Sequence, residues 1–195
     1  MTLHIDAVAE SILAGFIVTL RSARTNADLT QNEVASGMLV RGRAISEWEC
    51  GTIQPKLGNL IEWSGRLHYR FVVLGQDGEP LRGPSIRRPG EAWEHFERRR
   101  LASPLRNRRM ALGLSQTDLG RLVGVSKDSV QRWELACVPP RPIAHVVWAQ
   151  KLGYALGLWR VRSQRGTRIC GSCRDGGPQM ADSETRRRPG RPGGF

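Results

Sequence analysis

The side chains that most often carry metal or catalytic chemistry are few and scattered in this sequence. Cys170 and Cys173 have the spacing of zinc ligands or of a redox pair, but no second cysteine pair and no histidine follows at the distance of a structural zinc site. A metal site there would need ligands from distant residues or from a second chain. The histidines form no cluster, and the sequence contains neither a glycine-rich phosphate loop nor a nucleophile elbow. We therefore expect no metal, no cofactor and no enzymatic activity.

Arginine is the abundant functional side chain. The formal net charge is +12 and the sequence pI is about 11.0, which favours a polyanionic partner, nucleic acid first and an anionic membrane second. Arginine makes bidentate contacts with phosphate and guanine, although its abundance is also typical of a GC-rich genome. Residues 1–80 hold 7 basic and 9 acidic side chains, net −2, and residues 81–195 hold 23 and 9, net +14. The second part of the chain is therefore the electropositive one.

The cysteine content and the apolar segments indicate a cytoplasmic protein. Four cysteines without a secretory signal favour a reducing compartment. The apolar run from Leu13 to Leu20 is shorter than the ~20 residues of a membrane-spanning helix and has no basic start, so it predicts a buried helix. We expect a location in the cytoplasm of a bacterial or phage-host cell, in association with the nucleoid, and no membrane contact.

An internal repeat organises the chain at an offset of 85 residues over about 55 positions. Identical residues at this offset include Arg24 and Arg109, Gln31 and Gln116, Trp48 and Trp133, Glu49 and Glu134, and Trp63 and Trp148. Because the chain has only 6 tryptophans, the matching tryptophans are hard to obtain from composition alone. The repeat predicts a duplicated domain, with the tryptophans as core anchors.

The second copy has clear helix signals. Ser103 and Pro104 predict a helix start that Gly113 ends, after a separate amphipathic helix over 91–100 whose arginines either grip phosphate or form a solvated face. Residues 115–118 resemble a capping box, Gly124 suits a left-handed turn, and Ser126 caps a further helix. Two short helices joined by a glycine turn are the helix-turn-helix geometry. In each copy a fourth helix and then a strand follow, the strands covering 69–74 and 154–161.

The segment Leu-Ser-Gln-Thr-Asp-Leu-Gly-Arg-Leu-Val-Gly-Val-Ser-Lys-Asp-Ser-Val-Gln-Arg-Trp-Glu at 114–134 resembles the Xre/Cro repressor helix-turn-helix family. The resemblance implies that the helix after Ser126 lies in the major groove of DNA. Lys127 or Arg132 can then donate to guanine O6 and N7, and Asp128 can accept from cytosine N4. The DNA-binding residues implied in this copy are Gln116 (to a phosphate), Ser126, Lys127, Asp128, Gln131 and Arg132. Alternatively, Gln116 is a solvated first-turn residue and Asp128 only favours the helix N-terminus.

The first copy is a degenerate member of the same family. Its implied contacts are Gln31 to a phosphate, with Arg41 and Arg43 exposed on the recognition helix. Leu39 replaces the turn glycine, which costs about 1 kcal/mol if that residue is left-handed, and Gly42 weakens the recognition helix by a similar amount. With its near-neutral charge, this copy is expected to bind DNA weakly by itself.

The sequence predicts an all-α fold of two tandem lambda-repressor-like helix-turn-helix domains, each followed by a short β-strand, and a disordered basic tail. We place the degenerate first domain at 6–75, a linker at 76–90, a linker helix plus the second domain at 91–161, and the tail at 162–195. Gly190-Arg191-Pro192 in the tail resembles part of an AT-hook, a minor-groove binding motif, but Pro189 stands where that motif has an arginine; the alternative is a nonspecific basic tail.

The expected function is a sequence-specific DNA-binding transcriptional regulator, a bacterial or bacteriophage repressor, with double-stranded DNA as partner. The alternative is an antitoxin-like protein whose first domain holds a protein partner. A third interpretation is a basic architectural or membrane-surface protein that uses charge alone. The two strands either pair within one chain, which gives a pseudo-dimer, or pair between chains in a homodimer; either arrangement removes an unpaired apolar edge.

Overall fold

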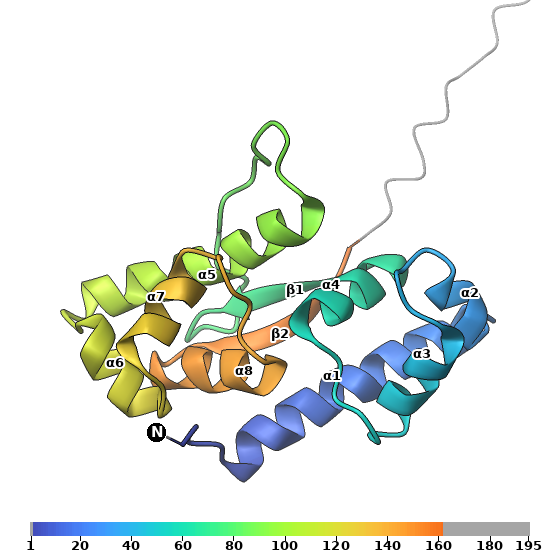
Figure 1. Ribbon diagram of the computed structural model, residues 1–195, viewed down its shortest axis with the longest axis horizontal. Helices are drawn as coiled ribbons and strands as arrows, with labels where there is room; N and C mark the ends of the chain where they lie inside the picture. Colours follow the sequence, from blue (N-terminus) through green and yellow to red (C-terminus); the bar gives the residue numbers. More distant parts are fainter. Residues whose placement is uncertain (1, 162–195) are drawn as a thin grey trace, which may run out of the picture. The chain divides into compact units, whose positions relative to one another are not determined.

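The computed structural model describes residues 2–161, which form eight α-helices and one small antiparallel sheet (Figure 1). The elements, in chain order, are α1 (Ala7–Asn26), α2 (Gln31–Ala35), α3 (Gly42–Glu49), α4 (Leu57–Arg66), β1 (Tyr69–Leu74), α5 (Trp93–Ala111), α6 (Gln116–Val123), α7 (Lys127–Glu134), α8 (Pro142–Lys151) and β2 (Ala155–Arg160). The predicted Cys170 and Cys173 pair and the predicted tail lie outside the described residues.

The element order of the N-terminal half (residues 7–74) recurs in the C-terminal half (residues 93–160). Helices α3 and α7 begin and end 85 residues apart, and so do α4 and α8. Helices α1 and α5 also end 85 residues apart, while α2 is shorter than α6. In the view of Figure 1, α2 and α3 lie on one side of the strands and α6 and α7 on the other. The offset seen in the sequence is thus also the offset between elements of like position.

The two strands pair with each other in antiparallel orientation, as expected for pairing within one chain. Val72 lies opposite Gly157, which is also its equivalent 85 residues later in the chain. On either side, Phe71 pairs with Leu158 and Val73 with Leu156. The sheet therefore joins the halves through strands whose positions are equivalent except for one residue at each end.

The outer edge of β1 is covered. The Leu81 amide donates to the Val73 carbonyl at 2.7 Å, and the Arg100 guanidinium donates to the Phe71 carbonyl. Arg100 is itself buried and paired with Glu97, which also binds Arg70 of β1. Burial lowers the pKa of Arg100, partly offset by Glu97. These contacts satisfy carbonyl groups that an edge strand would otherwise present to another chain.

Aromatic side chains occupy the core in matching positions. The Trp48 and Trp63 ring centroids are 5.8 Å apart, and those of Trp133 and Trp148 are also 5.8 Å apart. All four indoles are buried, which confirms their prediction as core anchors. Phe16 of α1 meets Phe71 edge to face at 5.2 Å and so ties the first helix to the sheet.

Helix α5 differs from the prediction. The two helices expected over 91–100 and from Ser103 are one continuous helix with Pro104 in its interior. Leu101 and Leu105, one helical turn apart on either side of Ser103, are both buried in the core, and Phe96 is buried on another face, so tertiary packing outweighs the helix-starting preference of Ser103. The run Arg98–Arg100 is neither a phosphate grip nor a solvated face, because its members pair with Glu94, Glu91 and Glu97.

The halves also touch through the N-terminal arm (residues 2–5). The His4 amide donates to the Val123 carbonyl at 2.9 Å, and its Nδ1 lies 3.1 Å from the Leu122 carbonyl, at the end of α6. The Thr2 backbone crosses so close to Gly124 that a Cβ at this position would collide with it. The arm therefore holds the start of α1 against the turn after α6.

Within residues 2–161, no helix is both long and apolar enough to cross a lipid bilayer. The same residues contain no group of three histidine, cysteine or acidic side chains that could hold a metal ion.

Candidate nucleic-acid interface

Helices α6 and α7 form a compact pair joined by a three-residue turn. Ser115 and Asp118 make a reciprocal capping box at the start of α6, as predicted, and the hydrogen bonds from Ser115 lower the pKa of the Asp118 carboxyl. Gly124 ends α6 with φ +85°, in the left-handed region. Ser126 then caps α7 by accepting from the Ser129 amide. Local capping chemistry thus sets both ends of the turn.

The corresponding turn of the N-terminal half is built differently. Thr30 and Glu33 form an equivalent capping box, but α2 ends at Ala35. Leu39 does not have a positive φ, so the strain expected for a left-handed leucine is absent. Gly42 is buried against Asn32, where a Cβ would collide with the asparagine side chain. In place of a glycine turn, this half therefore has a shorter α2. Gly42 lowers the helix propensity of α3, but it also allows α3 to pack closely against Asn32.

A buried ion pair links three elements of the C-terminal half. Arg109 of α5 binds Glu134 of α7 through Nε and Nη2, at 2.5 and 3.0 Å, and donates to the Leu114 carbonyl at 2.7 Å. Gln116, at the start of α6, donates through Nε2 to the same carboxylate at 2.8 Å. The Glu134 side chain is only 1% exposed. This bidentate network fixes the orientation of the end of α7 relative to α5 and α6.

The N-terminal half contains the same network. Arg24 binds Glu49 at 2.7 and 2.8 Å, and Gln31 donates to Glu49 at 2.9 Å. Burial alone would raise the pKa of Glu49, but hydrogen bonds from Arg24 and Gln31 outweigh burial and hold it below its usual value. Sequence reasoning missed this network. The signal was present, because the arginine, glutamine and glutamate are all identical at the 85-residue offset.

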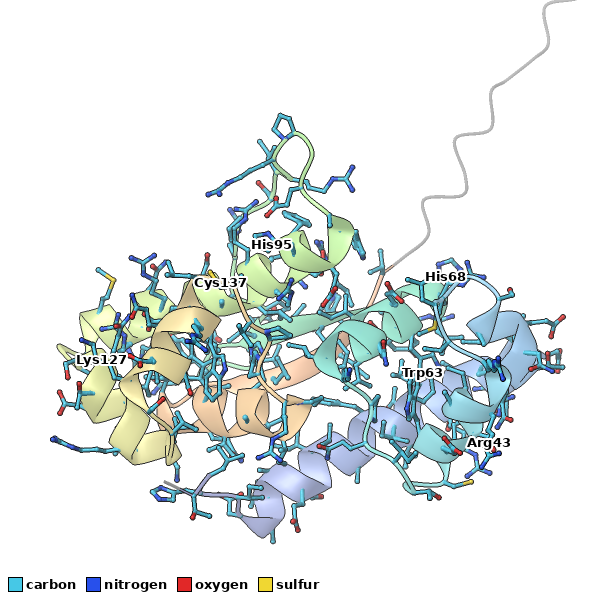
Figure 2. The ribbon with its side chains drawn as sticks, viewed as in Figure 1. Arg43, Trp63, His68, His95, Lys127 and Cys137 are labelled. Atoms are coloured by element: carbon cyan, nitrogen blue, oxygen red, sulfur yellow. The ribbon has the colours of Figure 1, made fainter. Side chains whose placement is uncertain are left out.

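The exposed face of α7 carries the residues expected to contact DNA. Lys127, Asp128, Gln131 and Arg132 are exposed on this helix, and the hydroxyl of Ser126 is engaged in the cap. In the described chain none of these charged side chains takes part in an ion pair. Figure 2 shows Lys127 at the edge of its half of the molecule. The positive groups of α7 are therefore available to an external anion.

Gln116 lies apart from that free surface. It is half-buried and one amide N–H is taken by Glu134, which leaves the second N–H of Nε2 for another acceptor. Gln31 has the same arrangement with Glu49. Both residues are thus neither free nor purely solvated, since the buried carboxylate positions the amide.

The face of α3 is electrostatically different. Arg43 pairs with Glu47 one turn later at 2.8 Å, and Glu47 raises the pKa of Arg43 through this hydrogen bond. Arg41, the N-cap residue of α3, is exposed and provides no side-chain cap. In Figure 2, Lys127 and Arg43 lie at opposite sides of the view. The N-terminal half therefore presents one charge-compensated pair where α7 presents unpaired cations.

Comparison with protein families matches residues 100–146 to the family described as helix-turn-helix domain. The matched residues include α5 from Arg100 to its end, all of α6 and α7, and the first half of α8. No curated protein and no solved structure matches the chain. Residues 100–146 thus form a helix-turn-helix domain, and this domain indicates a DNA-binding regulator.

Proposed function

We propose that this protein is a sequence-specific DNA-binding transcriptional regulator, a bacterial or bacteriophage repressor of the Xre/Cro type. In this proposal both halves are helix-turn-helix domains, and the two act as a dimer within one chain. The C-terminal half is the stronger reader of DNA, because both cations of α7, Lys127 and Arg132, are free, whereas Arg43 of α3 is paired with Glu47.

The observation that carries this proposal is the register of the sheet. Val72 pairs with its own equivalent, Gly157, and flanking positions pair in exchanged order. A ladder with this register maps onto itself under a twofold rotation, which is the symmetry of an isologous dimer. In this proposal the same rotation also relates α3 to α7. Two recognition helices related in this way suit an imperfect palindrome, with half-sites about one DNA turn, roughly 34 Å, apart.

The buried networks support a positioning role for the two glutamines. Glu134 holds one N–H of Gln116, and the other would meet a phosphate oxygen when α7 enters the major groove. Lys127 or Arg132 would then contact guanine and Asp128 cytosine, with Ser126 and Gln131 beside them. In the N-terminal half, Gln31 and Arg41 would contact the backbone, and Arg43 would need to leave Glu47 to contact a base.

Selection of bound duplexes from a random pool, followed by sedimentation of the complex, tests this function. We expect one chain per duplex, unequal half-sites, and binding that survives excess competitor DNA. Insertion of about five base pairs between the half-sites turns them to opposite faces of the duplex and should weaken binding about 100-fold. Two chains per site would overturn the pseudo-dimer. Binding without sequence preference would favour the architectural interpretation instead.

An antitoxin-like role is the second candidate, in which the N-terminal half holds a protein. Leu39 at the turn before α3 is 100% exposed, and Arg43 is neutralised by Glu47 beside it. An exposed apolar tip next to a compensated charge suits a protein partner better than a phosphate backbone. A partner that co-purifies in equal amounts and is lost in Leu39→Asp would favour this role, and retention of the partner by that variant would contradict it.

A further inference from the structure

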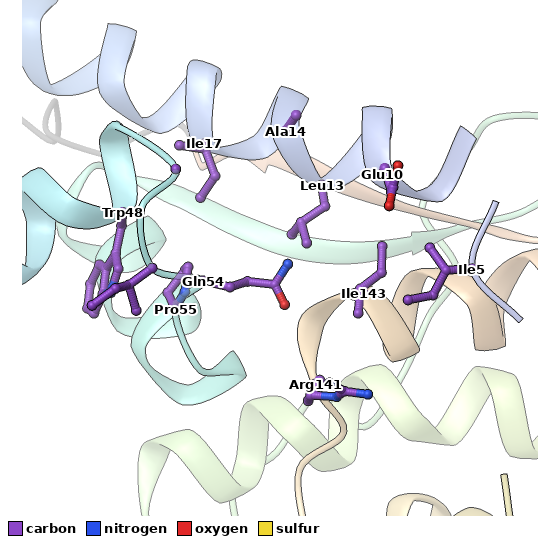
Figure 3. Close-up of a pocket in the computed structure, with 12 residues that line it drawn as sticks. Ile5, Glu10, Leu13, Ala14, Ile17, Trp48, Gln54, Pro55, Arg141 and Ile143 are labelled. Carbon is purple, nitrogen blue, oxygen red and sulfur yellow. The ribbon is translucent and has the colours of Figure 1, made fainter. Parts of the chain in front are cut away.

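An apolar cleft of about 320 Å³ lies between α1, the loop after α3 and the start of α8 (Figure 3). Leu13, Ala14 and Ile17 line it from one face of α1, and Ile143 lines it from the C-terminal half. Ile53 of the loop, which also lines it, is 49% exposed. The walls therefore come from both halves, and they leave apolar surface open to solvent.

The equivalent positions in the other half-to-half junction carry charged side chains. At the 85-residue offset, Leu13 corresponds to Arg98 and Ile143 to Gly58. Arg98 pairs with Glu94 at 3.4 Å, and the Glu94 carboxylate occupies the space that a side chain at position 58 would need. A separate cavity lies beside them and is lined by Lys56, Pro139 and Pro140, the equivalents of Arg141, Gln54 and Pro55. The apolar wall formed by Leu13 and Ile143 is thus replaced by an ion pair at the equivalent positions.

The polar groups of the cleft favour a ligand whose negative charge lies at the Arg141 side. Arg141 lines it as the N-cap residue of α8 and makes no side-chain hydrogen bond to the first turn of that helix. The cation and the positive end of the helix dipole therefore lie together. Figure 3 shows Gln54 extending into the space near Arg141, while Glu10 lies toward the other end, beside Ile5.

We propose that this cleft binds a small amphipathic anion, with its apolar body against α1 and its acidic group at Arg141. The volume is at the lower end of the range for small-molecule sites, about 300–1,000 Å³, so the ligand is compact. Because the walls belong to both halves, a bound ligand changes the separation of α3 and α7. This regulatory consequence rests on the proposed function, whereas the binding site does not.

Isothermal titration calorimetry of the full chain with 1-anilinonaphthalene-8-sulfonate, which carries apolar rings and a sulfonate, tests the site without DNA. Ala14→Trp fills the cleft and Arg141→Gln removes its cation, so each should weaken binding by about tenfold or more. Glu10→Gln removes a repulsive charge and should strengthen binding by about twofold. Circular dichroism and thermal unfolding of each variant establish that it is folded.

The matched controls are Val18→Trp, which adds the same bulk to an exposed position of α1 outside the cleft, and Lys56→Gln, the equivalent of Arg141 in the other half. Both should bind the probe within about twofold of the wild type. Equal losses in controls and cleft variants, or no loss in Ala14→Trp, would show that the probe binds elsewhere and overturn the site. A chain dimer that Ala14→Trp dissociates would assign the cleft to a second copy and would also overturn it.

The effector role is tested by repeating duplex binding at saturating probe with half-site spacings varied by one base pair. We expect the preferred spacing or the affinity to change by fivefold or more, and Ala14→Trp to lose this response. Probe binding in the cleft with an unchanged spacing series would contradict the effector role. Failure to bind any duplex would refute the proposed function, while the calorimetry would still decide the site.

Discussion

The two halves share their buried chemistry and differ at their surfaces. Each has an arginine, a glutamate and a glutamine in one network and a pair of packed tryptophans, with nearly equal distances in both. The exposed positions of α3 and α7 instead carry different residues and different charge pairing. The orientation of the helices thus depends on the buried set, while the charge that each half presents at its surface depends on a few exposed side chains.

The turns make the same point about the backbone. Gly124 allows α6 to run eight residues and end in a left-handed residue, whereas α2 stops after five residues and leaves Leu39 exposed. In both halves the next helix begins at the equivalent residue, Gly42 for α3 and Lys127 for α7. The N-terminal half therefore keeps the same order of helices without a turn glycine, because α2 is shorter than α6.

The largest expected effect concerns the shared networks. Arg109→Met leaves Glu134 buried without its cation and should lower the free energy of unfolding by about 3 kcal/mol. Arg24→Met should cost a similar amount because its pair has similar burial. Urea denaturation measures both, with the exposed pair variant Arg43→Met as a control that changes stability by less than about 0.5 kcal/mol. If only one of the two variants lost stability, the two networks would not be energetically equivalent.

A buried histidine distinguishes the halves by pH dependence. His145 is 1% exposed, neither ring nitrogen has a partner, and burial lowers its pKa to about 4. The equivalent residue in the N-terminal half is Leu60. Since the unfolded chain takes up a proton below its ordinary pKa of 6.5 and the folded chain does not, this residue lowers stability as pH falls from 6.5 to about 4.

His145→Leu should remove that dependence. The stability of the variant relative to the wild type should increase by about 3 kcal/mol between pH 6.5 and pH 4, as measured by urea denaturation at a series of pH values. The exposed His68→Leu serves as the control, with a small change across this range. A constant difference between wild type and His145→Leu would mean that folding does not lower the pKa of His145.

The third expected effect concerns the recognition helices. Lys127→Ala and Arg132→Ala should each weaken binding to the selected duplex by about 2 kcal/mol, because each removes a direct contact. Arg43→Ala should have a smaller effect because Glu47 already holds this arginine. Filter binding or fluorescence anisotropy at fixed salt measures the difference. Unchanged affinity in both α7 variants, with loss in Arg41→Ala and Arg43→Ala, would reverse the roles of the halves.

The smallest expected effect is at the turns. Gly124→Ala should lower the free energy of unfolding by about 1–2 kcal/mol from backbone strain, and it also displaces the Thr2 backbone. Leu39→Gly should lower it by about 0.4–1 kcal/mol, because glycine makes the unfolded chain more flexible and Leu39 has no positive φ to relieve. Thermal unfolding of both variants provides the test. A clear gain in Leu39→Gly would indicate a left-handed residue at that position.

The sequence by itself determined the features that depend on local chemistry. The capping box at Ser115, the left-handed Gly124 and the N-cap at Ser126 were predictable because each depends on neighbouring residues and backbone geometry. The repeat offset, the tryptophan core and the pairing of the two strands were also predictable, since identical residues recur at one spacing and each strand has an apolar edge to cover.

Only the tertiary structure decided features that depend on residues distant in the chain. Ser103 and Pro104 carry the signals of a helix start, yet burial of Leu101 and Leu105 in the core on either side of Ser103 makes α5 continuous. The conversion of an arginine run into ion pairs, and the capture of Gln116 by Glu134, both require partners that folding brings together. Local signals record what a segment prefers, and burial against distant segments decides which preferences prevail.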